Sequence, residues 1–137
     1  MTKQLFELLT IERLKESKLL LDAGCYSGAY YLVGYAVECG LKAVIVKQVN
    51  AHEIPSKAFV LDFYVHDLER LIKLAGIDQA HKSNLKSNQD FRVNWNTVNN
   101  WNEGARYKEW TQIEANDLYN AVNNLNGGIL AWIQRYW

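Results

Sequence analysis

One carboxylate lies in the middle of the most apolar stretch of the chain. Glu38 falls within residues 28–44, where the only other charged side chain is Lys42. A buried charge without a partner is costly, so Glu38 must be paired, protonated or used in chemistry. Lys42 lies one helical turn further along, and Tyr31 and Tyr35 could donate hydrogen bonds to the carboxylate. These four residues indicate a structural ion pair, which we favour, or a polar binding surface if they line a cleft.

Two further side chains have chemistry that suits a phosphate or a proton. Arg106 precedes Tyr107 in a glycine-containing loop, and a guanidinium fork beside a phenol can bind an anion. Alternatively, Arg106 ties this loop to Glu38 or to the last helix. His66 could serve as a general base. A side chain at the start of a short helix can also simply cap or pack, and we favour this because no partner for His66 is visible in the sequence.

We expect no metal site and no cofactor. His52 and His81 have no ligand spacing with a cysteine, and no phosphate-binding glycine loop or nucleophile triad is present. Cys25 and Cys39 lie on one predicted helix, where they would be separated by roughly 21 Å. A disulfide needs Cα atoms within about 7 Å, so the two cysteines are interpreted as small hydrophobic residues in a reducing cytoplasm.

Composition narrows the class of protein without naming a function. The 137 residues suit a single domain with a real core, and 15 basic residues balance 15 acidic ones. This balance gives no overall electrostatic footprint for nucleic acid, although it leaves room for a local basic patch. The N-terminal residues begin an amphipathic pattern, so no signal peptide is expected. The apolar run is interrupted by Gly, Glu and Lys, and we expect no membrane span.

Helical periodicity accounts for most of the chain, and no segment requires a strand. The expected helices are Leu5–Asp22, Tyr26–Gln48, His66–Ala75, Asp78–Trp101 with a split near Ser87-Asn88, and a last helix beginning at the Thr111 capping box. Residues 50–65 are expected to form a loop with at most a short extended or helical piece. The pattern predicts an all-α, up-and-down bundle of four or five helices.

The buried faces of three helices follow from the same spacing. The predicted inward residues are Leu8, Ile11, Leu14 and Leu21 in the first helix and Leu118, Val122, Leu125, Ile129, Trp132 and Tyr136 in the last. In the second helix, a stripe of small residues allows close approach of another helix: Cys25, Ala29, Leu32, Ala36, Cys39 and Ala43. The last pattern stays in phase across Gly127-Gly128, so one weakened helix is expected there. Tryptophans at 95, 101, 110, 132 and 137 are assigned mainly to core and interface packing, although Trp137 has no obvious core position.

Several of these segments together resemble HEPN-domain proteins. Residues 29–43 are similar to the second-helix motif of that family. The sequences His66-Asp67-Leu68 with Leu71, Trp95 with Trp101, and Gly104-Ala105-Arg106-Tyr107 follow in the family's order. The resemblance implies a helical bundle that forms homodimers. It also implies a prokaryotic two-protein system, of the toxin–antitoxin or defence type, whose partner is a minimal nucleotidyltransferase.

The active members of that family are metal-independent ribonucleases with an Arg followed four to six residues later by a His. This chain departs from the motif. His81 is the first histidine after Arg70 and lies too far along, Arg13 has no histidine at the required spacing, and no histidine follows Arg92, Arg106 or Arg135. The resemblance therefore favours a binding module that engages nucleotide, RNA or a partner protein.

Two other hypotheses remain open from the sequence. One is a ribonuclease with a rearranged site, in which Arg106 binds phosphate, His66 is the base and Glu38 orients one of them. The other is a small-molecule or nucleotide receptor. The candidate binding residues are Tyr31, Tyr35, Glu38, Lys42, Arg106 and Tyr107.

Overall fold

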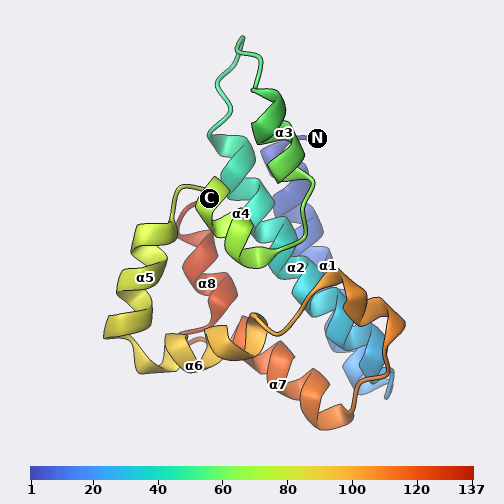
Figure 1. Cartoon of the computed structure of the whole chain (residues 1–137). Coiled ribbons are helices and arrows are strands. Elements are labelled where there is room, and N and C mark those ends of the chain that lie inside the picture. Colours follow the sequence, from blue (N-terminus) through green and yellow to red (C-terminus); the bar gives the residue numbers. More distant parts are fainter.

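The computed structural model describes residues 1–137 and contains only helices and loops (Figure 1). The elements are α1 (Lys3–Asp22), α2 (Tyr26–Lys47), α3 (Lys57–Phe63), α4 (Leu68–Leu74), α5 (Asp78–Ser87), α6 (Gln89–Val98), the 3-10 turn η1 (Glu103–Tyr107), α7 (Gln112–Asn123) and α8 (Ile129–Gln134). The all-helical class is confirmed. Eight α-helices replace the four or five expected, because a short helix forms within residues 50–65 and two predicted helices are each broken in two.

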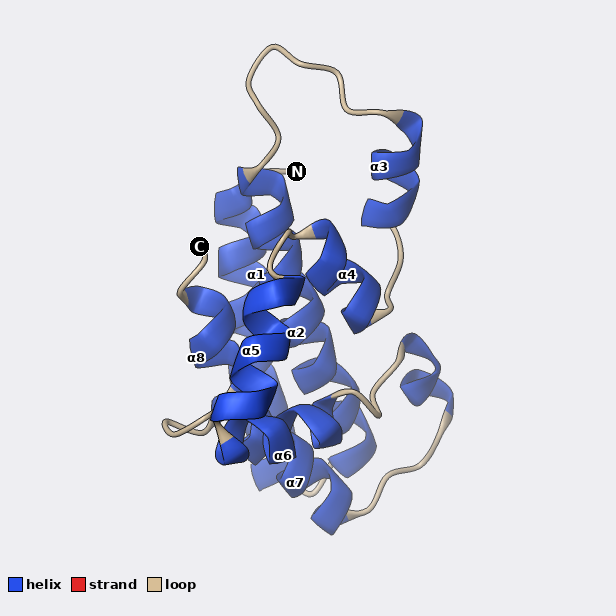
Figure 2. Ribbon diagram, turned by 60° about the vertical axis from the view of Figure 1, so that its left-hand side comes forward, coloured by secondary structure: helices blue, strands red, loops and turns tan.

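Helix α2 is the centre of the bundle. It packs against α1, α4, η1, α7 and α8, and it is the longest helix in Figure 1. Its length and apolar composition alone would allow it to cross a membrane, but 78% of its most apolar window is buried inside the protein. This is the position expected of a helix that is apolar on nearly every side. By contrast, α3 and the loop before it project from one end of the bundle (Figure 2).

The face that α1 turns toward the core differs from the prediction in part: Leu21 is buried and Leu14 packs against the core, as predicted, but two other residues do not. Leu8 and Ile11 are 54% and 47% exposed, while Thr10 and Ser17 are fully buried. Both hydroxyls are satisfied locally, since Thr10 Oγ1 donates to the Phe6 carbonyl and Ser17 Oγ donates to the Ala29 carbonyl of α2, each at 2.8 Å. Small hydroxyl residues thus allow the backbones of α1 and α2 to approach closely, and this approach sets the rotation of α1.

The predicted helix from Asp78 to Trp101 is split at the expected place. Asn88 ends α5, and its side-chain oxygen accepts a hydrogen bond from the Phe91 N–H at 3.0 Å, so the same residue caps α6. Beyond α6, Trp101 is 3% exposed and lies directly against Gly34 of α2. A side chain at Gly34 would overlap the indole ring, so this glycine is required by the close approach of Trp101.

The prediction of one continuous last helix is wrong. The capping box of Thr111 and Glu114 starts α7 as expected, but the helix ends at Asn123 and Asn124 is extended. Gly127 has a φ of +71°, which favours glycine, and its carbonyl accepts a hydrogen bond from Asn94 Nδ2 at 3.0 Å. Leu125 falls in this connection and is 94% exposed rather than part of the core.

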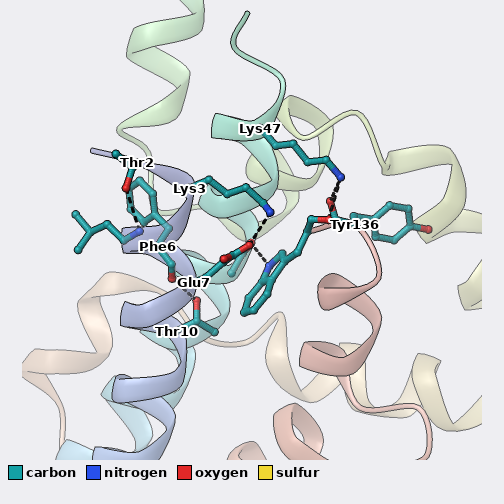
Figure 3. Close-up of polar contacts among 10 residues, drawn as sticks. Thr2, Lys3, Phe6, Glu7, Thr10, Lys47 and Tyr136 are labelled. Atoms are coloured by element: carbon teal, nitrogen blue, oxygen red, sulfur yellow. Dashed lines mark hydrogen bonds and ion pairs between the residues drawn. The ribbon is translucent and has the colours of Figure 1, made fainter. Parts of the chain in front are cut away.

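Hydrogen bonds hold the C-terminal residues against α2 (Figure 3). The Trp137 indole N–H donates to the Gly40 carbonyl at 3.1 Å, and Lys47 Nζ donates to the Trp137 and Tyr136 carbonyls at 2.9 and 3.2 Å. The other tryptophans pack as predicted: Trp95, Trp101 and Trp132 are buried, and Trp110 stacks on Tyr30.

A histidine lies inside the aromatic part of the core. His81 is 7% exposed, and its ring centroid lies 4.4 Å from that of Trp95, 5.5 Å from Trp132 and 5.8 Å from Phe91. Burial lowers the pKa of His81, and the Glu69 carboxylate opposes this shift only in part. The surroundings therefore favour the neutral imidazole.

We predict that alanine lowers the free energy of unfolding at Gly34 of α2 but not at Gly40 of the same helix. Gly34→Ala should destabilise the fold by about 2 kcal/mol, because the new methyl group overpacks against Trp101. Gly40→Ala is the matched control, since a Cβ there would meet Ile133 at 3.5 Å, an ordinary contact. It should be neutral or stabilise the helix by up to about 1 kcal/mol. Urea unfolding of both variants measures this, and equal stabilities would contradict the proposed packing.

We predict that His81 lowers stability in mild acid. Below a pH of about 6.5 the unfolded chain binds a proton at this residue before the folded chain does. The free energy of unfolding should therefore fall with pH, by up to about 1.4 kcal/mol per pH unit, until the folded state also becomes protonated. His81→Leu should remove this part of the pH dependence and His52→Gln should keep it. Chemical denaturation at several pH values tests the difference, and identical slopes in all three proteins would refute it.

Candidate functional site

The carboxylate of Glu38 is buried between two cationic or hydrogen-bonding partners. Its side chain is 2% exposed, and Oε1 lies 2.8 Å from Lys42 Nζ. His66 Nδ1 lies 2.9 and 3.0 Å from the two carboxylate oxygens. The ion pair with Lys42 was the favoured interpretation of the sequence. His66 lies in the segment between α3 and α4, and it is one of the two residues that the rearranged-site hypothesis expects Glu38 to orient.

This contact determines which nitrogen of His66 faces outward. A carboxylate accepts hydrogen bonds and does not donate them, so Nδ1 carries the hydrogen and donates to Glu38. In the neutral ring Nε2 is then an acceptor, and the His66 side chain is 42% exposed. A buried carboxylate that sets the tautomer of a partly exposed histidine is also the arrangement found in general-base pairs.

Short local contacts hold the three side chains in place. Asp67 caps α4 by accepting a hydrogen bond from the Arg70 N–H at 2.8 Å, which fixes the backbone beside His66. The Arg70 side chain in turn binds Asp62 of α3 at 2.7 Å. On the other side, Lys42 Nζ lies 5.3 Å from the centroid of the Phe63 ring, so α3 covers the ammonium with an aromatic face.

His66 opens onto a cleft of about 560 Å³ between the start of α4 and the segment from the end of α6 to η1. The lining residues are Val65, His66, Asp67, Leu68, Glu69, Arg70, Asn99, Trp101, Asn102 and Glu103. Most of them are polar, and the indole of Trp101 is buried behind them. Apart from His66, none was a candidate in the sequence, because they come from separate segments that share no spacing pattern.

The two tyrosines predicted to bind Glu38 do not do so. Tyr31 and Tyr35 form a parallel stack with ring centroids 6.2 Å apart, and Tyr31 also stacks with Trp101 at 6.1 Å. Burial raises the pKa of Tyr35 to about 12, with smaller contributions from Cys39 and Glu38. Tyr35 therefore stays neutral, and the two tyrosines form a row of rings with Trp101 instead of binding the carboxylate.

Arg106 and Tyr107 form a separate exposed pair. The guanidinium carbon lies 5.0 Å from the centroid of the Tyr107 ring, and Tyr107 is 80% exposed. The Tyr107 phenol and, less strongly, Tyr31 raise the pKa of Arg106. A side-chain hydrogen bond holds the turn that carries the pair, since Trp110 Nε1 donates to the Ala105 carbonyl at 3.0 Å. Arg106 has no ion pair with Glu38 or the last helix, so the predicted alternative of a loop tether is wrong.

The structure thus divides the candidate residues into three groups. They are the buried cluster of Glu38, Lys42 and His66, the stacked tyrosines Tyr31 and Tyr35, and the exposed pair Arg106 and Tyr107. No group of three His, Cys, Asp or Glu side chains is placed to hold a metal ion. The exposed pair and the His66 cleft are the two places where an external ligand can meet these residues.

We predict that Glu38 and Lys42 are tolerated in the core only when both are present. Glu38→Leu leaves the Lys42 ammonium buried without its carboxylate and should destabilise the fold by about 3–5 kcal/mol. The double variant Glu38→Leu/Lys42→Met removes both charges and should recover most of that loss. Thermal or urea unfolding compares the two, and a double variant no more stable than the single one would contradict this account.

Comparison of the chain with protein-family models, with curated proteins and with solved structures finds no match. A function for this protein must therefore be inferred from its own residues and their geometry.

Proposed function

We propose that this protein is a HEPN-type binding module that engages nucleotide or RNA through the exposed pair of Arg106 and Tyr107. In this proposal it is a cytoplasmic homodimer and one component of a prokaryotic two-protein system, of the toxin–antitoxin or defence type, with a nucleotidyltransferase-type partner. The support for the family comes from the resemblance of residues 29–43 and from the all-helical bundle built around them.

The geometry of the exposed pair carries the ligand part of the proposal. Tyr107 presents its ring to solvent, and a base can stack on an exposed aromatic ring with about 1–3 kcal/mol of favourable energy. Arg106 lies over the same ring and can bind a phosphate with its planar fork. Lys108 follows directly and is exposed. A stacking surface and two cations on one turn match the two parts of a nucleotide.

The burial of Glu38 supports a structural role for the cluster beneath α4. Its two partners already occupy the carboxylate, and all three side chains connect α2 to the start of α4. The missing Arg-to-His spacing also weighs against the family's nuclease chemistry in this chain.

A metal-independent endoribonuclease with a rearranged site is the second candidate. One observation favours it, namely the bond from Glu38 that orients His66 toward a cleft. However, Arg106 lies over Tyr107 and forms no hydrogen bond or ion pair with His66 or Glu38, which weighs against a shared site.

The decisive experiment measures binding of a fluorescent oligoadenylate and of AMP in metal-free buffer. Tyr107→Ala and Arg106→Ala should each weaken binding of the oligoadenylate by about tenfold, since each removes one part of the contact. Tyr64→Ala is the matched control, because Tyr64 is also exposed, at 59%, but follows α3 and lies outside η1.

The same samples distinguish the two candidates. If the RNA stays intact and its binding depends on Tyr107, the result supports the binding module. Cleavage that is lost in His66→Ala supports the ribonuclease. Binding equal in the wild type and both turn variants would refute the assignment of the exposed pair.

A further inference from the structure

We propose that the cleft at His66 is a second binding site, which takes a cationic hydrogen-bond donor: the guanidinium or ammonium group of a basic peptide segment or of a free amine. The site lies between α4 and η1 and shares no residue with the exposed pair of Arg106 and Tyr107. It goes beyond the nucleotide function proposed above and does not depend on it.

The first argument is the tautomer of His66. Because Nδ1 donates to the buried Glu38 carboxylate, Nε2 of the neutral ring is left as an acceptor without an intramolecular partner. The ring cannot turn to present a donor without breaking both contacts with Glu38. A ligand in the cleft that meets this nitrogen in the neutral ring must supply the hydrogen.

The second argument is the charge of the cleft. Its lining carries three carboxylates, on Asp67, Glu69 and Glu103, against one guanidinium, on Arg70. That guanidinium is already bound to Asp62 at 2.7 Å, outside the lining. These carboxylates repel an entering phosphate or carboxylate and attract a cation, which they approach from both α4 and η1.

The third argument is that the carboxylates of Glu69 and Glu103 can still accept hydrogen bonds from a ligand. Glu69 Oε1 already accepts a hydrogen bond from Asn99 Nδ2 at 3.1 Å, which holds the carboxylate at the edge of the cleft. Glu103 has no ion pair and is half-buried. A guanidinium has five N–H donors in a planar fork, and it forms strong charge-assisted hydrogen bonds with carboxylates. The cleft volume of about 560 Å³ accommodates such a side chain with its neighbours.

The test uses agmatine and a capped diarginine peptide, with the same peptide carrying neutral citrulline as the uncharged control. Calorimetry at low ionic strength should show binding of the arginine peptide and not of the citrulline peptide. Glu69→Gln and Glu103→Gln should each weaken binding about tenfold, as expected for loss of a charge-assisted contact. Asp117→Asn on α7 is the control, because Asp117 is exposed and has no ion pair.

Nuclear magnetic resonance of the wild-type protein provides a readout that needs no variant. Titration with the arginine peptide should shift the Nε2 resonance of His66 and leave the exposed His52 unchanged. A peptide that binds more tightly than agmatine indicates a protein partner, and equal affinities indicate a free amine. No binding, binding unaffected by both Glu variants, or an unchanged His66 resonance would overturn the proposal. None of these outcomes bears on nucleotide binding at Tyr107.

Discussion

The arrangement of the bundle depends on a charge placed inside its most apolar helix. Glu38 cannot remain in the core of α2 without compensation, and Lys42 alone satisfies only one of its oxygens closely. His66 completes the set, so the start of α4 must lie against the middle of α2. This requirement links the buried core to the surface, because the same histidine that closes the cluster opens onto the cleft. A polar residue in the core thereby determines where one of the candidate sites lies.

Close approach of backbones is the second condition for this arrangement. Ser17 reaches the Ala29 carbonyl across the α1–α2 contact, and Trp101 lies flat against Gly34. The indole also stacks on Tyr31, which in turn stacks on Tyr35. The same buried tryptophan lines the His66 cleft and lies two residues before η1, the turn that carries Arg106 and Tyr107.

The two surfaces differ in charge although they meet at η1. Glu103, at its first position, faces an acidic cleft, and Arg106, near its end, faces solvent with an aromatic ring. An overall charge of zero is therefore compatible with carboxylates along the cleft and an exposed guanidinium on the turn. Separate ligands of opposite charge are compatible with this geometry, since a nucleotide and a basic segment would not compete for the same atoms.

The sequence alone determined the features that depend on neighbours within one helix. The central position of α2, the Glu38–Lys42 pair and the Thr111 capping box all follow from helical spacing, because residues three or four apart are brought together by the helix itself. Tertiary structure decided which face of α1 is buried, where the last helix breaks and that His66, 28 residues away, binds Glu38. These depend on how surfaces of separate helices fit together, and periodicity contains no information about such fits. For the same reason, helical spacing placed Tyr31 and Tyr35 near Glu38 but did not show that their rings stack on each other instead of binding it. The cleft could not be predicted, because it is built from two segments that are distant in the sequence.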